Sequence, residues 1–270
     1  MKVTIVVDNI EHAGIPGEWG FCAYIEQNGK KLLLDTGASN LFAENAEKLN
    51  IDLKDIDFAV LSHAHYDHAN GMEKFFEINR KATFYLQEGC GENCYFKKGF
   101  IRKYIGIPKG ITKKYQDRIE YVSGVYTVAD GIYLVSHSTP HLEQIGKKEM
   151  MYQKTKLGWK PDNFCHEQSL VLDTDGGLVI FNSCSHGGVV NIINEVKAAF
   201  PNKKITALIG GFHIFKHPEA EIRELAKLIK ETGIERIYTG HCSKERGYRI
   251  LREELGDMVG QFYVGMELVF

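Results

Sequence analysis

The 270-residue sequence has only six cysteines and two tryptophans, and its net charge is close to zero. So few cysteines in a chain of this length do not suggest a disulfide scaffold, and they fit a reducing, cytoplasmic environment. The 33 lysines and arginines against 35 aspartates and glutamates leave a net charge of −2. This balance argues against a surface that coats nucleic acid, and we expect no nucleic-acid partner.

Long hydrophobic runs are also missing. No apolar stretch reaches the roughly 18 to 20 residues that a membrane-spanning helix needs, so we expect no membrane association. Residues 1–8 read as a strand and not as an export signal. With 44% hydrophobic and 25% charged residues the composition is that of a folded protein, which excludes an intrinsically disordered chain. We expect one domain over residues 1–270.

Short apolar runs typical of strands alternate with helical patterns along the chain. Strands are predicted over residues 3–7, 21–25, 31–34, 58–62, 82–86, 125–128, 131–135, 169–172, 178–181, 205–209, 236–239 and 261–270. Helices are predicted over residues 41–49, 190–200, 219–231 and 243–255, the first with Asn40 as its N-cap. This order, repeated in the two halves, indicates an α/β fold with two sheets packed face to face and helices outside.

Two stretches, near residues 89–118 and 142–165, show little periodicity. Irregular segments of this length inside a compact domain are usually functional lids or disordered, and we expect lids over a site. The first stretch is basic, with aromatic residues interleaved, and this pattern favours contact with a ring-bearing anionic substrate. A solvated basic loop or a dimer contact is the alternative. The central cations of the first stretch are Lys97, Lys98, Arg102 and Lys103.

The most informative segment is residues 61–71, which reads LSHAHYDHANG. Three histidines and one aspartate fall within six residues at the end of a predicted buried strand. Alternate residues of a turn, here His63 and His65, can bind one metal ion. Asp67 and His68, which follow, can bind at a second metal position beside it. Imidazole and carboxylate together suit zinc, iron or manganese better than calcium or magnesium. Solvated loop histidines are the alternative interpretation.

This segment resembles the His-x-His-x-Asp-His motif of the metallo-β-lactamase-fold hydrolases. The resemblance covers nearly the whole chain and implies a four-layer αββα sandwich with the metals at one edge of the two mixed sheets. Three later motifs are similar to the subgroup that includes the archaeal 7,8-dihydropterin-6-methyl-4-(β-D-ribofuranosyl)aminobenzene-5′-phosphate synthases. These motifs are SCSHGG at residues 183–188, IGGFH at 209–213 and TGHC at 239–242. The chain departs from that subgroup at Ser183, where glycine is usual, and at residues 243–244, where Thr-Gly is usual.

The resemblance implies two divalent transition-metal ions, with zinc expected and manganese or iron as alternatives. It places one ion on His63, His65 and His186, and the other on Asp67, His68 and His241. Asp67 is also the expected catalytic residue, because it would orient the hydroxide that bridges the metals. Asp35 is expected to support the ligands, and His213 to contact substrate or support the ligands, with a role as a metal ligand as the alternative.

Several residues keep two interpretations at this stage. Cys184 is either a thiolate ligand or an ordinary buried cysteine. Gly187 and Gly188 either offer backbone N–H groups to an anion or simply begin a helix. His141 and His166 are left outside the site because neither has the family's flanking residues. The apolar end of the chain pairs either within a sheet or across a homo-oligomer.

The expected function is that of a dinuclear metal-dependent hydrolase or transferase. Its substrate would be small, anionic and phosphorylated, and the resemblance suggests a relation to pterins. One alternative is a non-catalytic metal-binding or regulatory protein of the same fold. The other is a flavodiiron-like oxidoreductase, which is disfavoured because its motif has glutamate where His65 stands.

Overall fold

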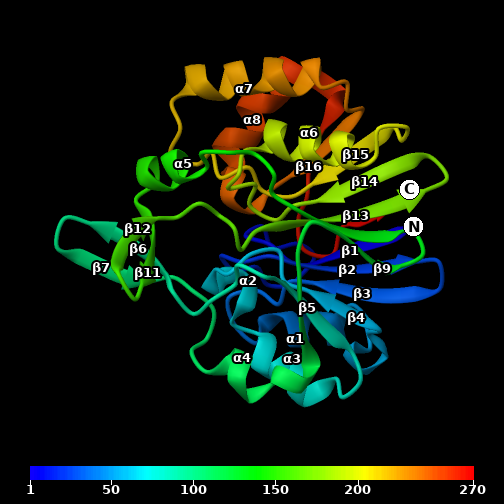
Figure 1. Cartoon of the computed structure of the whole chain (residues 1–270). Helices are drawn as coiled ribbons and strands as arrows, with labels where there is room; N and C mark the ends of the chain where they lie inside the picture. The colour runs from blue at the N-terminus through cyan, green and yellow to red at the C-terminus, as the bar shows by residue number, and fades with distance from the viewer.

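Two seven-stranded β-sheets stack face to face in the computed structural model, which describes all 270 residues (Figure 1). The first sheet contains, in spatial order, β18 (Glu267–Val269), β1 (Lys2–Val7), β2 (Cys22–Gln27), β3 (Lys30–Leu34), β4 (Phe58–Val60), β5 (Thr83–Gln87) and β8 (Ile119–Val122). The second contains β17 (Val259–Gln261), β16 (Arg236–Thr239), β15 (Ile205–Ile209), β14 (Gly177–Phe181), β13 (Gln168–Thr174), β10 (Ile132–Ser136) and β9 (Val125–Ala129).

The two sheets share a hydrophobic core. Ile25 of the first sheet and Phe181 of the second belong to one buried cluster. Successive side chains of a strand point to opposite faces. In β3, Leu32 and Leu34 therefore join this central core, whereas Leu33 packs against the outer helices. Burial on both faces explains why these strands read as continuous apolar runs.

Helices cover the outer face of each sheet, so the expected four-layer αββα sandwich is confirmed (Figure 1). The helices near the first sheet are α1 (Leu41–Lys48), α2 (Tyr66–Ala69), α3 (Met72–Ile78) and α4 (Ile111–Lys114). Those over the second are α6 (Val189–Ala199), α7 (Glu219–Glu231) and α8 (Lys244–Leu255). Asn40 precedes α1 as predicted, but its side chain makes no capping hydrogen bond.

The parallel strands of each sheet determine where the site forms. In the first sheet β3, β4, β5 and β8 run parallel, and in the second β14, β15, β16 and β17 do so. Parallel strands bring the loops at their carboxyl ends to one edge, which is where α/β folds bind ligands. The histidine motifs follow β4, β14, β15 and β16.

The two stretches expected to be irregular form a third, four-stranded sheet. Its order is β12 (Gly158–Pro161), β11 (Met151–Thr155), β6 (Cys94–Lys98) and β7 (Ile101–Tyr104), and α5 (Glu143–Lys148) precedes β11. The link between the stretches is the antiparallel pairing of β6 with β11, for example Phe96 opposite Met151. Local periodicity misses this sheet because its strands are short and the pairing joins segments far apart in the chain.

The prediction of one terminal strand over residues 261–270 is wrong. The segment divides between the sheets, because β17 pairs with β16 in the second sheet and β18 pairs with β1 in the first. The chain crosses between them at Gly265, whose φ of 83° is in the left-handed region. The apolar end of the chain thus completes a sheet within the molecule.

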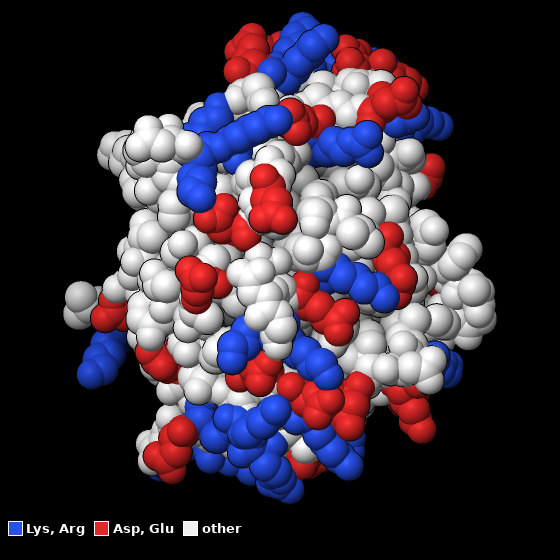
Figure 2. All heavy atoms as spheres, turned by 90° about the vertical axis from the view of Figure 1, so that its right-hand side faces the viewer, with Lys and Arg blue, Asp and Glu red and all other residues white.

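The surface carries mixed charge on the face turned away from the third sheet, where basic and acidic side chains are interspersed (Figure 2). None of the helices has the length and apolar character needed to cross a bilayer.

Candidate metal centre

The histidine motif spans the turn between β4 and α2, which carries His63 and His65, and α2 itself, which carries Asp67 and His68. His65 has an extended backbone and immediately precedes the first residue of α2. The ring of His63 lies 4.6 Å from that of His65 and 4.2 Å from that of His68, measured between centroids. His63 and His68 are completely buried. The turn and α2 therefore bring the motif histidines into one buried cluster.

His186 joins this cluster from the loop after β14. Its Nε2 lies 3.1 Å from Nδ1 of His65, and its ring centroid lies 4.8 Å from that of His63. Each of the three histidines offers a ring nitrogen that lies within 4.8 Å of those of the other two. Two nitrogens bound to one zinc ion at 2.0–2.1 Å in tetrahedral geometry are about 3.3 Å apart, so the spacing fits a shared ion.

Asp67, His68 and His241 form a second group beside the first. Nε2 of His68 lies 3.9 Å from Oδ1 of Asp67, and Nε2 of His241 lies 3.7 Å from Oδ2 of the same carboxylate. His241 comes from the turn after β16, on the opposite sheet from the motif. The carboxylate of Asp67 therefore lies between two histidines contributed by different sheets.

Several ring nitrogens in these groups have no hydrogen-bond partner although they are buried. They include Nε2 of His63 and Nε2 of His241. In both residues the other nitrogen is held by a protein oxygen, at 2.8 Å from Ser62 Oγ and 3.3 Å from Asn9 Oδ1 respectively. A buried polar atom without a partner is costly, and a metal ligand usually has its other ring nitrogen held in this way. The residues present fit a pair of bound metal ions.

Burial also sets the protonation of these histidines. It lowers the pKa of His63, His65, His186 and His241 well below the usual value, and their mutual proximity adds to the effect. The four rings are therefore neutral near neutral pH, which is the form that binds metal. Burial would lower the pKa of His68 too, but the carboxylates of Asp35 and Asp67 raise it.

The carboxylate of Asp35 supports the histidine motif through hydrogen bonds. It accepts hydrogen bonds from the Ser62 backbone at 2.7 Å, the Ser62 hydroxyl at 2.7 Å and the Ser183 hydroxyl at 2.6 Å. It also lies 2.8 Å from Nδ1 of His68. Ser183, where the related subgroup has glycine, thus contributes a hydrogen bond to the ligand support.

Two cysteines lie at the centre of the cluster. Sγ of Cys184 is 3.2 Å from Nε2 of His68 and 3.5 Å from Sγ of Cys242. Cys184 is within reach of ligand atoms from both groups, including those of His186 and His241. Cys242 was not singled out from the sequence, and the only signal was its position directly after His241. Burial raises the pKa of the Cys184 thiol well above its usual value.

His213 occupies the loop after β15. Its ring centroid lies 4.4 Å from that of His186, and its backbone N–H donates to Sγ of Cys242 at 3.2 Å. Its Nε2 is 3.9 Å from the Glu149 carboxylate. His213 therefore lies at the rim of the cluster, beside the ligand groups.

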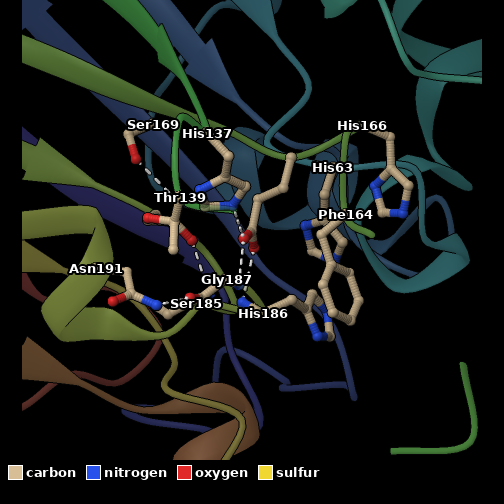
Figure 3. Close-up of polar contacts among 12 residues, drawn as sticks. His63, His137, Thr139, Phe164, His166, Ser169, Ser185, His186, Gly187 and Asn191 are labelled. Carbon is tan, nitrogen blue, oxygen red and sulfur yellow. Dashed lines mark hydrogen bonds and ion pairs between the residues drawn. The ribbon is translucent and has the colours of Figure 1, made fainter. Parts of the chain in front are cut away.

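A charged network, unanticipated from the sequence, holds the His186 loop (Figure 3). Glu167 accepts hydrogen bonds from the backbone N–H of His186 at 2.9 Å and of Gly187 at 2.8 Å. His137 lies 2.5 Å from Glu167 and 2.9 Å from Glu195. A Cβ at Gly187 would come within 2.2 Å of the His137 ring, so only glycine allows this approach.

Of the two interpretations of Gly187 and Gly188, contact with an anion is contradicted by their hydrogen bonds. The N–H of Gly187 donates to Glu167, and the N–H of Gly188 donates to the Ser185 carbonyl at 2.9 Å. Neither group is free for an anion. The role of the two glycines is instead in the backbone geometry of the loop between β14 and α6.

His166, left outside the site from the sequence, is buried against it, whereas His141 is exposed. The centroid of the His166 ring lies 5.3 Å from that of His65. The backbone N–H of Ala64 donates to Nδ1 of His166 at 3.2 Å, which places the ring hydrogen on Nε2, 3.1 Å from Asp162. His166 and Asp162 thus support the turn through hydrogen bonds.

Left-handed backbone conformations are concentrated at this centre. Such conformations in residues other than glycine each cost about 1–3 kcal/mol and cluster at functional sites. They occur, with φ between 45° and 60°, at Asp35, Ser185, His213 and His241.

A cavity of about 350 Å³ opens onto the ligand groups, and the third sheet supplies part of its wall. Of the four cations predicted to contact substrate, only Lys103 lines it, with Nζ 5.9 Å from the Tyr66 ring centroid. Lys97 lies over the ring of Tyr152 and Arg102 over Trp159, both within the third sheet. Lys98 is exposed at the end of β6. The remaining cation of the cavity is Lys216, and its aromatic residues are Trp19, Tyr66, Phe96 and Phe215.

An αββα sandwich with clustered histidines and an aspartate at the edge of its sheets defines the class of metallo-β-lactamase-fold proteins. Residues 19–147 match the profile of the metallo-beta-lactamase superfamily. This match covers a little under half of the 270 residues, so the chain is similar to this superfamily over that part of its length.

Two relatives cover almost the whole chain. One is the 7,8-dihydropterin-6-methyl-4-(beta-D-ribofuranosyl)-aminobenzene-5'-phosphate synthase of Methanocaldococcus jannaschii, 28% identical over 93% of this chain and 88% of the relative. The other is the crystal structure of Tm1679, a metal-dependent hydrolase of the beta-lactamase superfamily, with a TM-score of 0.84, 27% identity and coverage of 100% and 99%. The Zn²⁺-bound PqqB of Methylobacterium extorquens shares the fold, with a TM-score of 0.60, 12% identity and full coverage of both chains.

Proposed function

We propose that this chain is a dinuclear metal-dependent enzyme, a hydrolase or transferase that acts on a small phosphorylated substrate. The observation that carries the proposal is the pair of ligand groups, one of His63, His65 and His186, the other of Asp67, His68 and His241. Zinc suits this set of imidazole and carboxylate groups, and manganese or iron are the alternatives.

Two ions held here would supply Lewis acidity and lower the pKa of bound water. Cys184 is within reach of both ligand groups, and its thiolate would be a further metal ligand. Asp67 has its two carboxylate oxygens directed to His68 and His241, which suits it to orient a water molecule. The Asp35 and Glu167 carboxylates keep the ligand turns in place.

The cavity suggests a substrate with a ring and an anionic group. Lys103 and Lys216 are its cations, and its aromatic walls offer faces for stacking. The name of the Methanocaldococcus relative describes a phosphorylated compound with a pterin and an aminobenzene ring. A pterin-related phosphate is therefore the substrate class that we propose for this chain.

Metal analysis and phosphodiester hydrolysis test the proposal together. The purified protein is expected to hold close to two transition-metal ions and to hydrolyse bis(4-nitrophenyl) phosphate. His63→Ala should weaken metal binding more than about tenfold, because it removes a direct ligand, and His141→Ala, at an exposed position, is the matched control. A protein that takes up neither zinc, manganese nor iron would refute the metal centre. Two bound ions without turnover of any phosphate ester would refute the hydrolase and leave a transferase or a non-catalytic protein.

A further inference from the structure

Lys244, the first residue of α8, has a backbone conformation that residues other than glycine rarely adopt. Its φ is 55° and its ψ is 170°, beside the region of backbone space that is essentially confined to glycine. The subgroup that the sequence resembles usually has glycine where this lysine stands. A strained residue costs free energy, and such residues cluster at active sites and ligand clamps. We therefore expect the side chain of Lys244 to have a function that offsets this cost.

The side chain of Lys244 lies against two aromatic residues of the cavity that opens onto the ligand groups. Its Nζ is 5.1 Å from the centroid of Trp19 and 5.4 Å from that of Phe215, and both residues line that cavity. The Trp19 ring is in turn 5.0 Å from the ring of His241, and the Phe215 ring is 5.1 Å from that of His213. Lys244 itself is exposed and does not line the cavity. Its ammonium group therefore lies at the outer side of the aromatic wall, one ring away from a candidate metal ligand.

A second lysine lies on the same wall. Nζ of Lys216 is 4.8 Å from the centroid of Phe215, and Lys216 lines the cavity. Lys216 and Lys244, the outer cation pair, therefore place two positive charges over one ring. Each charge is attracted by the face of the ring, but the two charges repel each other. An anion between them would be bound by both and would remove the repulsion.

The carboxylates near the outer cation pair are engaged with other groups. Glu18 and Glu245 line a cavity together with Lys244. Glu18 accepts hydrogen bonds from the loop after β3, at 2.9 Å from a backbone N–H and 2.6 Å from a serine hydroxyl, and Glu245 accepts one from a glutamine side chain at 2.8 Å. On the side of Lys216, the carboxylate of Glu149 faces two histidines, at 3.4 Å and 3.9 Å. Both ammonium groups therefore remain available for a bound anion.

We propose that the outer cation pair binds a phosphate group of the substrate, and that Lys244 determines the specificity for substrates that carry this group. The proposal rests on the proposed function and deepens it, because the substrate then has two anionic groups, one at the metal ions and one at the outer cation pair. Its ring packs between them, against Trp19 and Phe215. With glycine at residue 244, the outer phosphate would contact Lys216 alone.

The fluorescence of Trp19 measures binding at this wall directly. The only other tryptophan is Trp159 in the third sheet, so the full-length, zinc-loaded Trp159→Phe protein reports from Trp19 alone. The probes are adenosine 5′-monophosphate and adenosine 3′,5′-bisphosphate, which share a ring and differ by one phosphate. The bisphosphate is expected to bind about tenfold more tightly, because the second phosphate gains hydrogen bonds to charged groups. Lys244→Met should remove most of this preference, and Lys244→Arg, which keeps the positive charge, should retain it.

Lys109→Met is the matched control, because Lys109 also lies over an aromatic ring, that of Tyr104, but away from the cavity. Urea unfolding of Lys244→Gly separates binding from a structural role, since glycine relieves the backbone strain. Its urea midpoint should not fall, whereas its preference for the bisphosphate should be lost. No preference in the starting protein, a preference that survives in Lys244→Met, or an equal loss in Lys109→Met would overturn the inference. Metal content and phosphodiester turnover, measured on the same samples, report separately on the proposed function.

Discussion

Oδ2 of Asp35 lies 2.8 Å from Nδ1 of His68, and both side chains are completely buried. Because Nδ1 is engaged in this way, Nε2 of His68 is the nitrogen left for a metal ion. It faces Asp67 and Cys184. A carboxylate directly after β3 thus orients a candidate ligand on α2.

Replacing Asp35 by asparagine should weaken binding of the second metal ion about 10–100-fold. The change keeps the shape but removes the negative charge that holds the His68 ring. Competition with a chromogenic chelator measures the affinity. Asp55→Asn, in a surface pair with Lys31, is the control and should leave the affinity unchanged. Equal affinities in the two variants would show that Asp35 has no such role.

Replacing His241 is expected to change the metal content of the protein, whereas replacing His213 is not. Nε2 of His241 lies 3.7 Å from the Asp67 carboxylate and has no other partner, whereas Nε2 of His213 faces Glu149. We expect His241→Ala to lose one ion per chain and His213→Ala to keep both. Elemental analysis after dialysis decides between them. Loss of an ion from the His213 variant alone would reverse the assignment.

Lys103 is expected to contribute to substrate binding more than the other cations of its segment. Lys103→Met should raise KM for a phosphorylated substrate several-fold and flatten its salt dependence, because it removes a cation from the cavity. The double variant Lys97→Met/Arg102→Met is the control, since these side chains lie over rings of the third sheet. Steady-state kinetics at two ionic strengths measures both. A larger effect from the double variant would contradict this geometry.

The charge of His137 is expected to make the stability of the fold depend on pH. Burial alone would lower the pKa of His137, but hydrogen bonds to Glu167 and Glu195 raise it from 6.5 to about 10. Because the folded-state pKa is the higher one, the charged histidine stabilises the fold fully below about pH 6.5, and this contribution is lost as the pH rises to about 10. His137→Gln should therefore lower the free energy of unfolding by a few kcal/mol near pH 6 and by much less near pH 10.

Urea unfolding of the wild type and the variant at both pH values measures this difference. His141→Gln, at an exposed position, should show no such difference. A gap between wild type and His137→Gln that is as wide at pH 10 as at pH 6 would mean that the charge of His137 does not act in this way.

Local patterns predicted most of the fold. The central strands of the two main sheets read as apolar runs because both of their faces are buried, and α7 and α8 show clear helical periodicity. The third sheet was missed because β6 and β11 become partners only through a pairing across more than fifty residues. The last strand was misplaced because nothing local marks the crossing from one sheet to the other at Gly265.

The sequence by itself determined the chemistry of the centre, since the ligand types and the close spacing of His63, His65, Asp67 and His68 lie in one short segment. Only the tertiary structure decided their surroundings. Glu167 and Cys242 reach the centre from distant strands and turns, and the histidine–carboxylate network behind His186 has no motif. The reason is physical. Spacing along a chain limits which neighbours can share one metal ion, whereas the support of those ligands depends on contacts that exist only after the two sheets have packed.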